Sequence, residues 1–264
     1  MNPELGTTII KLGGAVAASP EACASLWREV ATIGGPVVVV HGGGPQATDL
    51  ARRLGHEPRI VAGRRVTSDL DLDVALYVMR GSVNARLVGS AKASGVNAVG
   101  VSGADGGLVG VVRRPPRVID GETVDFGHVG DVVGVDPALL GALLGAGFTP
   151  VVASVCADRE GDLYNVNADT VALELAVALG AARLILVAEA SGVRRDAADP
   201  STLISRLTPE AIAAGVEAGW IAGGMRPKLE VAREALSRGV PEVRVTSPDA
   251  VSDATRGTTI APEA

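Results

Sequence analysis

The stretch "VVVVHGGGPQATDL" (residues 37–50) decides the fold class. A run of valines is typical of a strand that is buried on both faces, and Gly42–Gly44 end that strand. The next residues have helical spacing, with Pro45 in the first turn, where its missing N–H is harmless. Backbone amides and the positive end of the helix converge at such a strand–glycine–helix junction, so the stretch predicts an anion-binding site.

The same alternation of apolar runs and helical spacing extends over the chain. It predicts a three-layer αβα sandwich: a central, mainly parallel sheet with helices on both faces. The expected strands are 7–12, 36–41, 97–102, 149–155, 182–190 and 242–247. The expected helices are 19–33, 45–54, 70–94, 167–179 and 226–238.

Two regions interrupt this alternation. Residues 57–67 predict a hairpin around Gly63, and residues 108–135 predict short antiparallel strands that turn at Asp120–Gly121. Excursions of this kind often shape a small-molecule pocket over the carboxyl ends of parallel strands.

Composition excludes several classes of protein. Aromatic residues make up 2% of the 264 residues, so the core must consist of Val, Leu, Ile and Ala, and the net charge of -6 argues against a nucleic-acid partner. Cys23 and Cys156 have no metal-ligand spacing, which indicates buried reduced thiols in a cytoplasmic protein. The uncharged segment 137–157 contains Gly145, Gly147 and Pro150, so it predicts a short helix, a turn and a buried strand rather than a membrane span.

The chain contains few lysines, and arginine supplies most of the 24 basic residues. Lys11 in "KLGG" (11–14) and Lys228 in "GGMRPK" (223–228) each lie beside a glycine pair. A compact ammonium fits beside a phosphoryl group in a narrow pocket better than a guanidinium does, although a few lysines also persist by chance. With "HGGG", the chain has two glycine-rich strand ends that could hold a phosphate chain between them.

Other nucleotide-binding loops fit less well. Residues 42–47 match G-x-G-x-x-A, but the hairpin carrying Arg64 and Arg65 stands where a dinucleotide-binding fold has its second strand and acidic residue. No G-x-x-x-x-G-K-[ST] motif occurs.

Several collinear motifs together resemble the amino-acid kinase family, in particular its members that phosphorylate N-acetylglutamate. The resemblance covers nearly the whole chain and implies one αβα sandwich, with acceptor binding and dimerisation in an N-terminal lobe (1–180) and ATP binding in a C-terminal lobe (181–264). The motifs are "IIKLGG" (9–14), "VHGGGPQ" (40–46), "GRRVT" (63–67), "GHVGDV" (127–132), "YNVNADTVA" (164–172), "GGMRPK" (223–228) and "GTTI" (257–260).

The implied reaction moves the γ-phosphoryl group of ATP, supplied with Mg²⁺, onto the side-chain carboxylate of N-acetyl-L-glutamate, giving N-acetylglutamyl 5-phosphate for arginine biosynthesis. A carboxylate with a pKa of about 4.3 is ionised at neutral pH and needs no general base. The chain has three histidines and no sign of a catalytic triad, which agrees with this chemistry. Since two anions must meet, the site must neutralise charge and hold both groups in line.

The resemblance also implies roles for single residues. Lys11 would contact the transferred phosphoryl group, Lys228 would bridge nucleotide and transition state, and Asp169 would orient both lysines. Taken alone, Asp169 also suits a helix N-terminus that favours an acidic side chain. The amides of a set of glycines would bind phosphoryl oxygens: Gly13, Gly14, Gly42, Gly43 and Gly44, of which Gly43 and Gly44 also contact the acceptor.

Arg65 and Asn165 would bind the α-carboxylate and the acetamido group of the acceptor, with neighbouring Arg64 as the alternative to Arg65. His128 is expected to be a structural turn residue. Phosphates and water would hold Mg²⁺, so no protein ligand for a metal is expected.

The chain departs from the family pattern in two places. Glu189 in "AEASGV" stands where relatives have aspartate, and "TSPDAVSDATR" (246–256) replaces a polar segment. The short run before the first strand leaves no room for the helix that joins hexameric, arginine-sensitive members, so we expect an arginine-insensitive homodimer.

Two alternatives remain. A related kinase of lysine biosynthesis acts on α-aminoadipate held by an acidic carrier protein, but "RRVT" and "NVNADTVA" favour acetylglutamate. A non-catalytic amino-acid or nucleotide sensor could share the fold, but Lys11, Lys228 and Asp169 favour an enzyme.

Overall fold

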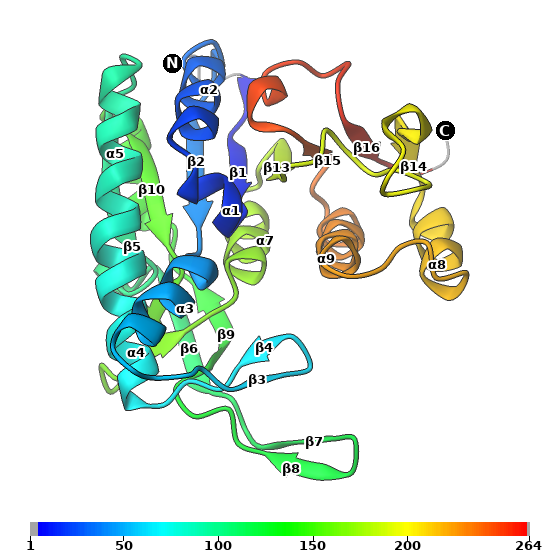
Figure 1. The fold of residues 1–264 in the computed structure, drawn as a ribbon. Helices are drawn as coiled ribbons and strands as arrows, with labels where there is room; N and C mark the ends of the chain where they lie inside the picture. The colour runs from blue at the N-terminus through cyan, green and yellow to red at the C-terminus, as the bar shows by residue number, and fades with distance from the viewer. Residues whose placement is uncertain (1–4, 263–264) are drawn as a thin grey trace.

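A computed structural model describes residues 5–262, in which a central sheet of eight strands lies between two layers of helices (Figure 1). All neighbouring strands are parallel except β15 and β16. This arrangement confirms the predicted three-layer sandwich with a mainly parallel sheet. In spatial order the strands are β14 (Arg206–Leu207), β16 (Thr258–Ile260), β15 (Glu242–Thr246), β13 (Arg183–Val187), β1 (Thr8–Leu12), β2 (Val37–His41), β10 (Thr149–Ala153) and β5 (Ala98–Ser102).

Alternate side chains of the central strands enter two separate cores. Ile9, Val38 and Val40 belong to one buried cluster, whereas Ile10 and Val39 belong to the other. Successive strand residues point to opposite faces of a sheet, so an unbroken valine run supplies both cores at once.

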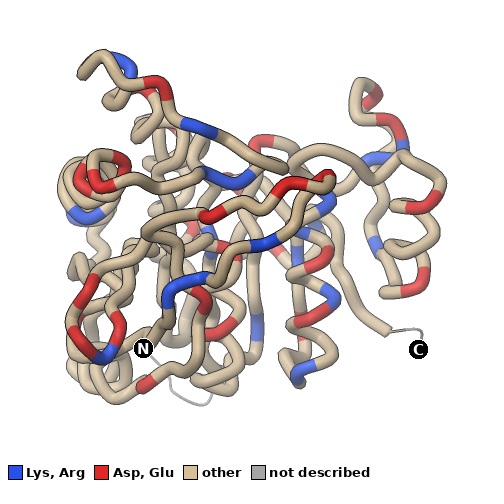
Figure 2. The backbone as a smooth tube through the Cα atoms, turned by 90° about the horizontal axis from the view of Figure 1, so that it is seen from below, with Lys and Arg blue, Asp and Glu red and all other residues tan. Residues whose placement is uncertain are grey.

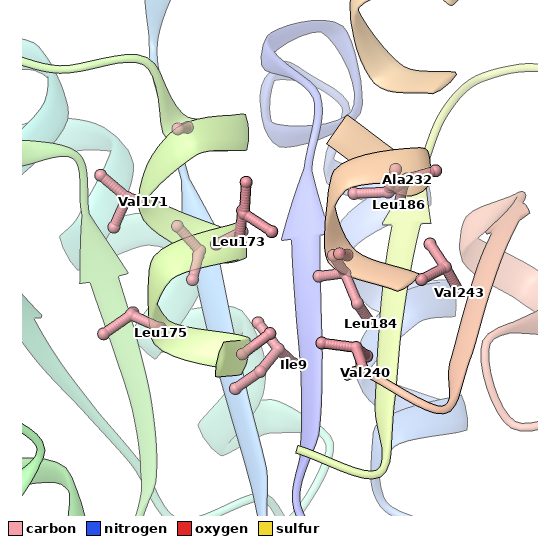
Figure 3. Close-up of a cluster of buried hydrophobic side chains, with 14 of the residues drawn as sticks. Ile9, Val171, Leu173, Leu175, Leu184, Leu186, Ala232, Val240 and Val243 are labelled. Atoms are coloured by element: carbon pink, nitrogen blue, oxygen red, sulfur yellow. The ribbon is translucent and has the colours of Figure 1, made fainter. Parts of the chain in front are cut away.

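Helices cover both faces of the sheet, and two of them pack on β1 and β13 as Figure 3 shows. The first core lies under α6 (Ala138–Gly145), α7 (Ala168–Ala178), α8 (Pro209–Glu217) and α9 (Met225–Ser237). The second lies under α1 (Gly14–Ala18), α2 (Pro20–Val30), α3 (Gly44–Arg53), α4 (Asp69–Ala75), the π-helix η2 (Leu76–Val83) and α5 (Asn84–Ala93). Short 3₁₀ turns are η3 (Asp105–Gly107), η4 (Pro200–Thr202) and η5 (Pro248–Ala250).

Further short strands lie near the carboxyl edge of the main sheet; six of them fall within the predicted excursions 57–67 and 108–135, whereas two, between residues 155 and 165, were not predicted. A four-stranded sheet has the order β12 (Leu163–Asn165), β11 (Val155–Ala157), β6 (Val109–Arg113) and β9 (Gly130–Val135). Two hairpins, β3 (Ile60–Val61) with β4 (Arg64–Arg65) and β7 (Arg117–Ile119) with β8 (Glu122–Val124), project on the same side (Figure 1). Asp120 and Gly121 have φ values of 51° and 83°, as the tight hairpin turn predicted there requires.

Some local features differ from the prediction. The helix expected over 70–94 is continuous from Asp69 to Ala93, but its middle winds as the π-helix η2. The strand expected over 149–155 ends at Ala153, and β11 continues the chain into the second sheet. Hydrophobic periodicity does not register either change, because Val78, Met79 and Val83 of η2 are buried as in an ordinary amphipathic helix and β10 and β11 are both apolar.

Two further expectations concern exposure. Residues 137–157 form α6, β10 and β11, with the predicted helix, turn and buried strand, and no helix among residues 5–262 has the length and apolar character that a membrane crossing requires.

Both cysteines are buried and unpaired, and burial raises the pKa of the Cys156 thiol to about 12. Figure 2 shows basic and acidic residues interspersed along the described chain rather than gathered in separate blocks.

The main sheet divides at β1. The strands β13, β14, β15 and β16 follow residue 180 and lie on one side of β1, whereas β2, β5 and β10 lie on the other. The boundary between the two predicted lobes therefore falls between two paired strands of one sheet, β1 and β13.

Arg244 of β15 is a buried cation that holds the segment departing from the family pattern. Its side chain is 2% exposed, and its guanidinium donates to the carbonyl oxygens of Val251, at 2.6 Å, and Asp253. The nearest carboxylate oxygen, Oε1 of Glu242, is 3.9 Å from Nε. Arg244 therefore closes the loop that leads from η5 to β16.

We expect Arg244→Met to lower the free energy of unfolding by about 3 kcal/mol, because it leaves buried carbonyl groups without donors. Urea denaturation measures this loss. Arg206→Ala is the control: this exposed arginine donates to the Pro262 carbonyl at 2.7 Å, and its replacement should change stability by at most about 0.5 kcal/mol. Equal stabilities of the Arg244→Met protein and the unsubstituted protein would contradict the assignment.

Candidate active site

The two glycine turns lie side by side at the carboxyl edge of the main sheet. Strands β1 and β2 are parallel neighbours, with Leu12 in register with His41, so the chain enters both turns at the same height. Gln46 Nε2 donates to the carbonyl of Gly14 at 2.8 Å, and a Cβ on Gly14 would lie 2.5 Å from Pro45 Cδ. Glycine at position 14 is therefore what allows the two turns to touch.

Free backbone amides converge at this edge. Helix α3 begins at Gly44 after the N-cap residue Gly43, and no acceptor within residues 5–262 takes the N–H groups of Gly14, Gly43 or Gly44. The Gly13 amide differs, because it donates to the Val187 carbonyl at 3.3 Å. The turns thus offer several amides and the positive end of α3 to an anion.

A buried histidine holds the second glycine turn in place. His41 is 0% exposed, and its Nδ1 lies 2.7 Å from the carbonyl oxygen of Gly42, so this nitrogen carries the proton. Its Nε2 accepts from Asn84 Nδ2 at 3.0 Å. Burial lowers the pKa of His41 to about 4 against the opposing effect of the bond to Gly42, so the ring is neutral at neutral pH.

Glycine is also required beneath this pair. A Cβ on Gly100 of β5 would lie 1.9 Å from Asn84 Oδ1, so any larger residue would displace Asn84 from His41. Asn84 Nδ2 donates in addition to the carbonyl of Val151 at 2.9 Å. Three strands and α5 therefore fix the position of the glycine turn.

Lys11 and Asp169 form an ion pair below the glycine turns. Lys11 Nζ lies 2.9 Å from both carboxylate oxygens, and the side chains of Lys11 and Asp169 are only 7% and 12% exposed. Asp169 stands in the first turn of α7, where Asn167 caps the helix and accepts from the Asp169 amide at 2.8 Å. The bond from Lys11 goes to Oδ2, and Oδ1 has no hydrogen-bond donor of its own among the described residues.

Lys228, in the first turns of α9, belongs to the same electrostatic group. Burial lowers the pKa of Lys228, the neighbouring ammonium of Lys11 lowers it further, and the carboxylate of Asp169 acts in the opposite direction. The sequence places these two lysines 217 residues apart, and the fold brings them close enough for their charges to interact. Within residues 5–262 no hydrogen bond of the Lys228 ammonium to a protein acceptor is found.

A cavity of about 350 Å³ opens between the glycine turns, the β3–β4 hairpin and the start of α7. It collects most of the residues that the sequence predicts to bind phosphate or acceptor, while Gly13, Asp169 and Lys228 lie outside its lining. Its walls are Lys11, Leu12, Gly14, Gly42, Gly43, Gly44, Thr48, Ile60, Gly63, Arg65, Met79, Ser154, Asn165, Val166, Asn167 and Ala168.

Both predicted acceptor-binding side chains line this cavity. Arg65 of β4 donates through Nη2 to Thr48 Oγ1 at 2.6 Å, and Asn165 of β12 donates to Thr67 Oγ1 at 3.3 Å. The neighbouring Arg64 is exposed and does not line the cavity; burial and the nearby guanidinium of Arg114 lower its pKa. The geometry therefore favours Arg65 over Arg64.

Three further residues, His128, Thr48 and Ser154, lie near or in the wall of the cavity. His128 Nε2 lies 2.6 Å from Asp69 Oδ1, and His128 does not line the cavity, in agreement with a structural turn residue. Sequence reasoning missed Thr48 and Ser154, which both line the cavity. Their positions contain the signal: Ser154 directly follows β10 at the carboxyl edge of the sheet, and Thr48 lies one helical turn after Gly44.

A three-layer sandwich in which glycine turns and a lysine line one cavity is the arrangement expected of a small-molecule kinase. A sequence model described as the amino acid kinase family matches residues 6–247. The chain belongs to the amino acid kinase family, which confirms the resemblance seen in the sequence motifs.

Individual relatives support this family membership. The acetylglutamate kinase of Methanopyrus kandleri is 43% identical over 96% of this chain and 99% of its own length. That of Anaeromyxobacter sp. (strain K) is 46% identical over 90% and 89%, respectively.

Solved structures show the same fold. The N-acetylglutamate synthase of Neisseria gonorrhoeae, solved with coenzyme A and N-acetyl-glutamate, superposes with a TM-score of 0.82 at 24% identity, over 98% of this chain. This chain spans 60% of that longer one. The carbamate kinase of Giardia lamblia bound to AMP-PNP superposes with a TM-score of 0.70 at 15% identity, over 98% of this chain and 99% of its own.

The buried His41 makes stability depend on pH. The unfolded chain protonates His41 near pH 6.5, whereas the folded chain keeps it neutral down to about pH 4, so the unfolded state binds the extra proton between these values. This contribution to stability is complete above pH 6.5 and is lost as the pH falls, by about 3 kcal/mol in total. Denaturant titrations across this range measure the slope.

His41→Gln is the control for this prediction. It places a neutral group that can still accept from Asn84, and it should remove the part of the slope due to one proton while other titrating groups keep theirs. Identical slopes for His41→Gln and the unsubstituted protein would show that His41 is not the responsible group.

Proposed function

We propose that the protein transfers the γ-phosphoryl group of ATP to the side-chain carboxylate of N-acetyl-L-glutamate. The observation that carries this proposal is the single cavity whose walls include Lys11 and the glycine turns as well as Arg65 and Asn165. Its size suits a small dicarboxylic acid with a phosphoryl group above it. The relatives named acetylglutamate kinase, which match along almost the whole chain, support the choice of acceptor.

The proposed chemistry needs charge neutralisation rather than proton transfer. The acceptor carboxylate is already a nucleophile at neutral pH, and it must approach a phosphoryl group that is itself negative. Fixed amides and ammonium groups lower the energy of this encounter, because they are oriented before the reaction begins. We propose Gly14, Gly43 and Gly44 as amide donors to phosphoryl oxygens. Gly42 shapes the same turn. Gly13 is a weaker candidate, because its amide already donates to Val187.

Lys11 and Lys228 supply the cations in this proposal. Lys11 reaches the phosphoryl group from the acceptor side, and Lys228 reaches it from the nucleotide side. Asp169 lies between them in charge: its carboxylate pairs with Lys11, and it also acts on Lys228, whose pKa it raises against the effects of burial and of Lys11. Two positive charges and one negative charge leave a net positive field for the transferred group.

The acceptor is oriented by two side chains. Arg65 suits the α-carboxylate, since its guanidinium is positively charged and keeps N–H groups beyond those bound to Thr48 and Gly44, and Asn165 suits the acetamido group. The described residues contain no cluster of acidic, histidine or cysteine side chains that could hold a metal ion. We therefore propose that the Mg²⁺ that accompanies ATP is bound by phosphate oxygens and water.

The wider setting is part of the same proposal. We infer that residues 1–180 bind the acceptor and form a homodimer, that residues 181–264 bind ATP, and that the enzyme serves arginine biosynthesis in the cytoplasm. The sheet order supports the division into lobes, and two buried, unpaired thiols suit a reducing compartment.

Trapping the acyl phosphate as a hydroxamate tests the proposed function directly. We expect ATP-dependent hydroxamate formation with N-acetyl-L-glutamate and much less with glutamate, aspartate or carrier-bound α-aminoadipate, because the cavity presents donors for both ends of the acetylated acceptor. Preference for the carrier-bound acceptor would indicate the lysine pathway. ATP binding without turnover of any acceptor would indicate a sensor.

Lys11→Arg tests the role of the first cation. The change keeps the charge but places a broader group where the ammonium is 6% exposed and bound to Asp169, so turnover should fall at least about 100-fold with the fold intact. Lys92→Arg, on the exposed surface of α5, is the matched control and should leave turnover unchanged. Normal kinetics of Lys11→Arg would remove Lys11 from the site.

A further inference from the structure

The helix that begins at the glycine turn also holds the acceptor-binding arginine. Thr48 lies one turn into α3, and its hydroxyl donates to the Gly44 carbonyl at 3.0 Å. The same oxygen accepts from Arg65 Nη2 at 2.6 Å, and Nη2 also donates to the Gly44 carbonyl at 3.2 Å. Thr48 and Gly44 thereby bind one end of the guanidinium from a second element of the fold.

A second contact fixes the other end of the guanidinium. Arg65 Nη1 lies 3.4 Å from Asp71 Oδ1, and Asp71 is itself buried and bound through Oδ2 to Ser68 Oγ at 2.6 Å and His56 Nε2 at 3.1 Å. Arg65 is therefore held between α3 and α4. Its side chain is 10% exposed, and it lines the cavity, where its remaining N–H groups are available to a ligand.

The two contacts differ in what they do to the charge of Arg65. A carboxylate such as that of Asp71 orients the guanidinium and also competes electrostatically with an anionic ligand. The Thr48 hydroxyl is neutral and its bond is the shorter one, so it orients Arg65 without reducing the attraction for a carboxylate. Without it, the long arginine side chain would have to give up more rotational freedom when the ligand binds.

We propose that Thr48 is a positioning residue that aims Arg65 at the α-carboxylate of the acceptor. This inference rests on the proposed function. It also gives α3 two roles. The first residues of the helix present amides to the phosphoryl group, and Thr48, one turn later, holds Arg65, which binds the carboxylate. The competing interpretation is an ordinary helix threonine whose hydroxyl bonds the carbonyl four residues earlier and affects only stability.

A matched pair of substitutions separates the two interpretations. Thr48→Val keeps the shape of the side chain and removes the hydroxyl, so the KM for N-acetyl-L-glutamate should rise about tenfold, the loss expected for a hydrogen bond to a charged group. Both kcat and the KM for ATP should stay within about twofold to threefold of the unsubstituted protein, since the phosphoryl-binding amides are unchanged. Thr48→Ser restores the hydroxyl and should restore the KM.

Thr48→Ala and melting curves of all variants guard against a change in folding. Thr48→Ala should reproduce the rise in KM at a melting temperature close to that of Thr48→Ser. An unchanged KM in Thr48→Val, or equal rises in the KM values for acceptor and ATP, would overturn the role of Thr48 alone. Absence of turnover by the unsubstituted protein with N-acetyl-L-glutamate would overturn the proposed function together with this inference.

Discussion

The parallel pairing of β1 with β2 is the constraint on which the site depends. Because Leu12 and His41 end their strands in register, the two glycine turns emerge at one edge of the sheet and at one height. Each turn alone offers a few amides, and their contact through Gly14 and Pro45 brings these amides together on one surface that suits an anion. The neutral pair of His41 and Asn84 then fixes this surface from within the core.

The cations of the site differ in how nearby groups compensate their charge. The buried ion pair of Lys11 and Asp169 compensates most of the cost of placing a cation inside the protein, and Lys228 approaches it from a different part of the chain. At the acceptor end, Arg65 is held mainly by neutral oxygens, which leaves its charge available. Each of these cations is therefore only partly compensated, Lys11 by Asp169 and Arg65 by its longer contact with Asp71.

Much of the fold followed from the sequence, for identifiable reasons. The central strands consist of unbroken apolar runs, and the turn at Asp120–Gly121 has residues that accept positive φ, so both were predictable. The π-helix η2 and the short strands β14 and β16 were not, because their pattern of apolar residues is also that of an ordinary helix or of irregular chain.

The site residues also divide into those that the sequence identifies and those that it does not. The lysines and glycines stand out by rarity and clustering, and most of the predicted residues meet in one cavity. Thr48 and Asn84 are common residue types in unremarkable contexts, and their contacts with Arg65 and His41 join different elements of the fold. Only the three-dimensional structure reveals such partners, since one sequence contains no information on which distant side chains touch.

The ladder between β1 and β13 has a mechanical consequence. Five residue pairs join the strand that carries Lys11 to the first strand beyond residue 180, and the Gly13 amide adds a further bond to Val187. A wide hinge swing between the two halves would break this ladder, whereas a change in sheet twist would preserve it. A movement between the two halves that keeps this ladder intact would therefore have to be a change in the twist of the single sheet.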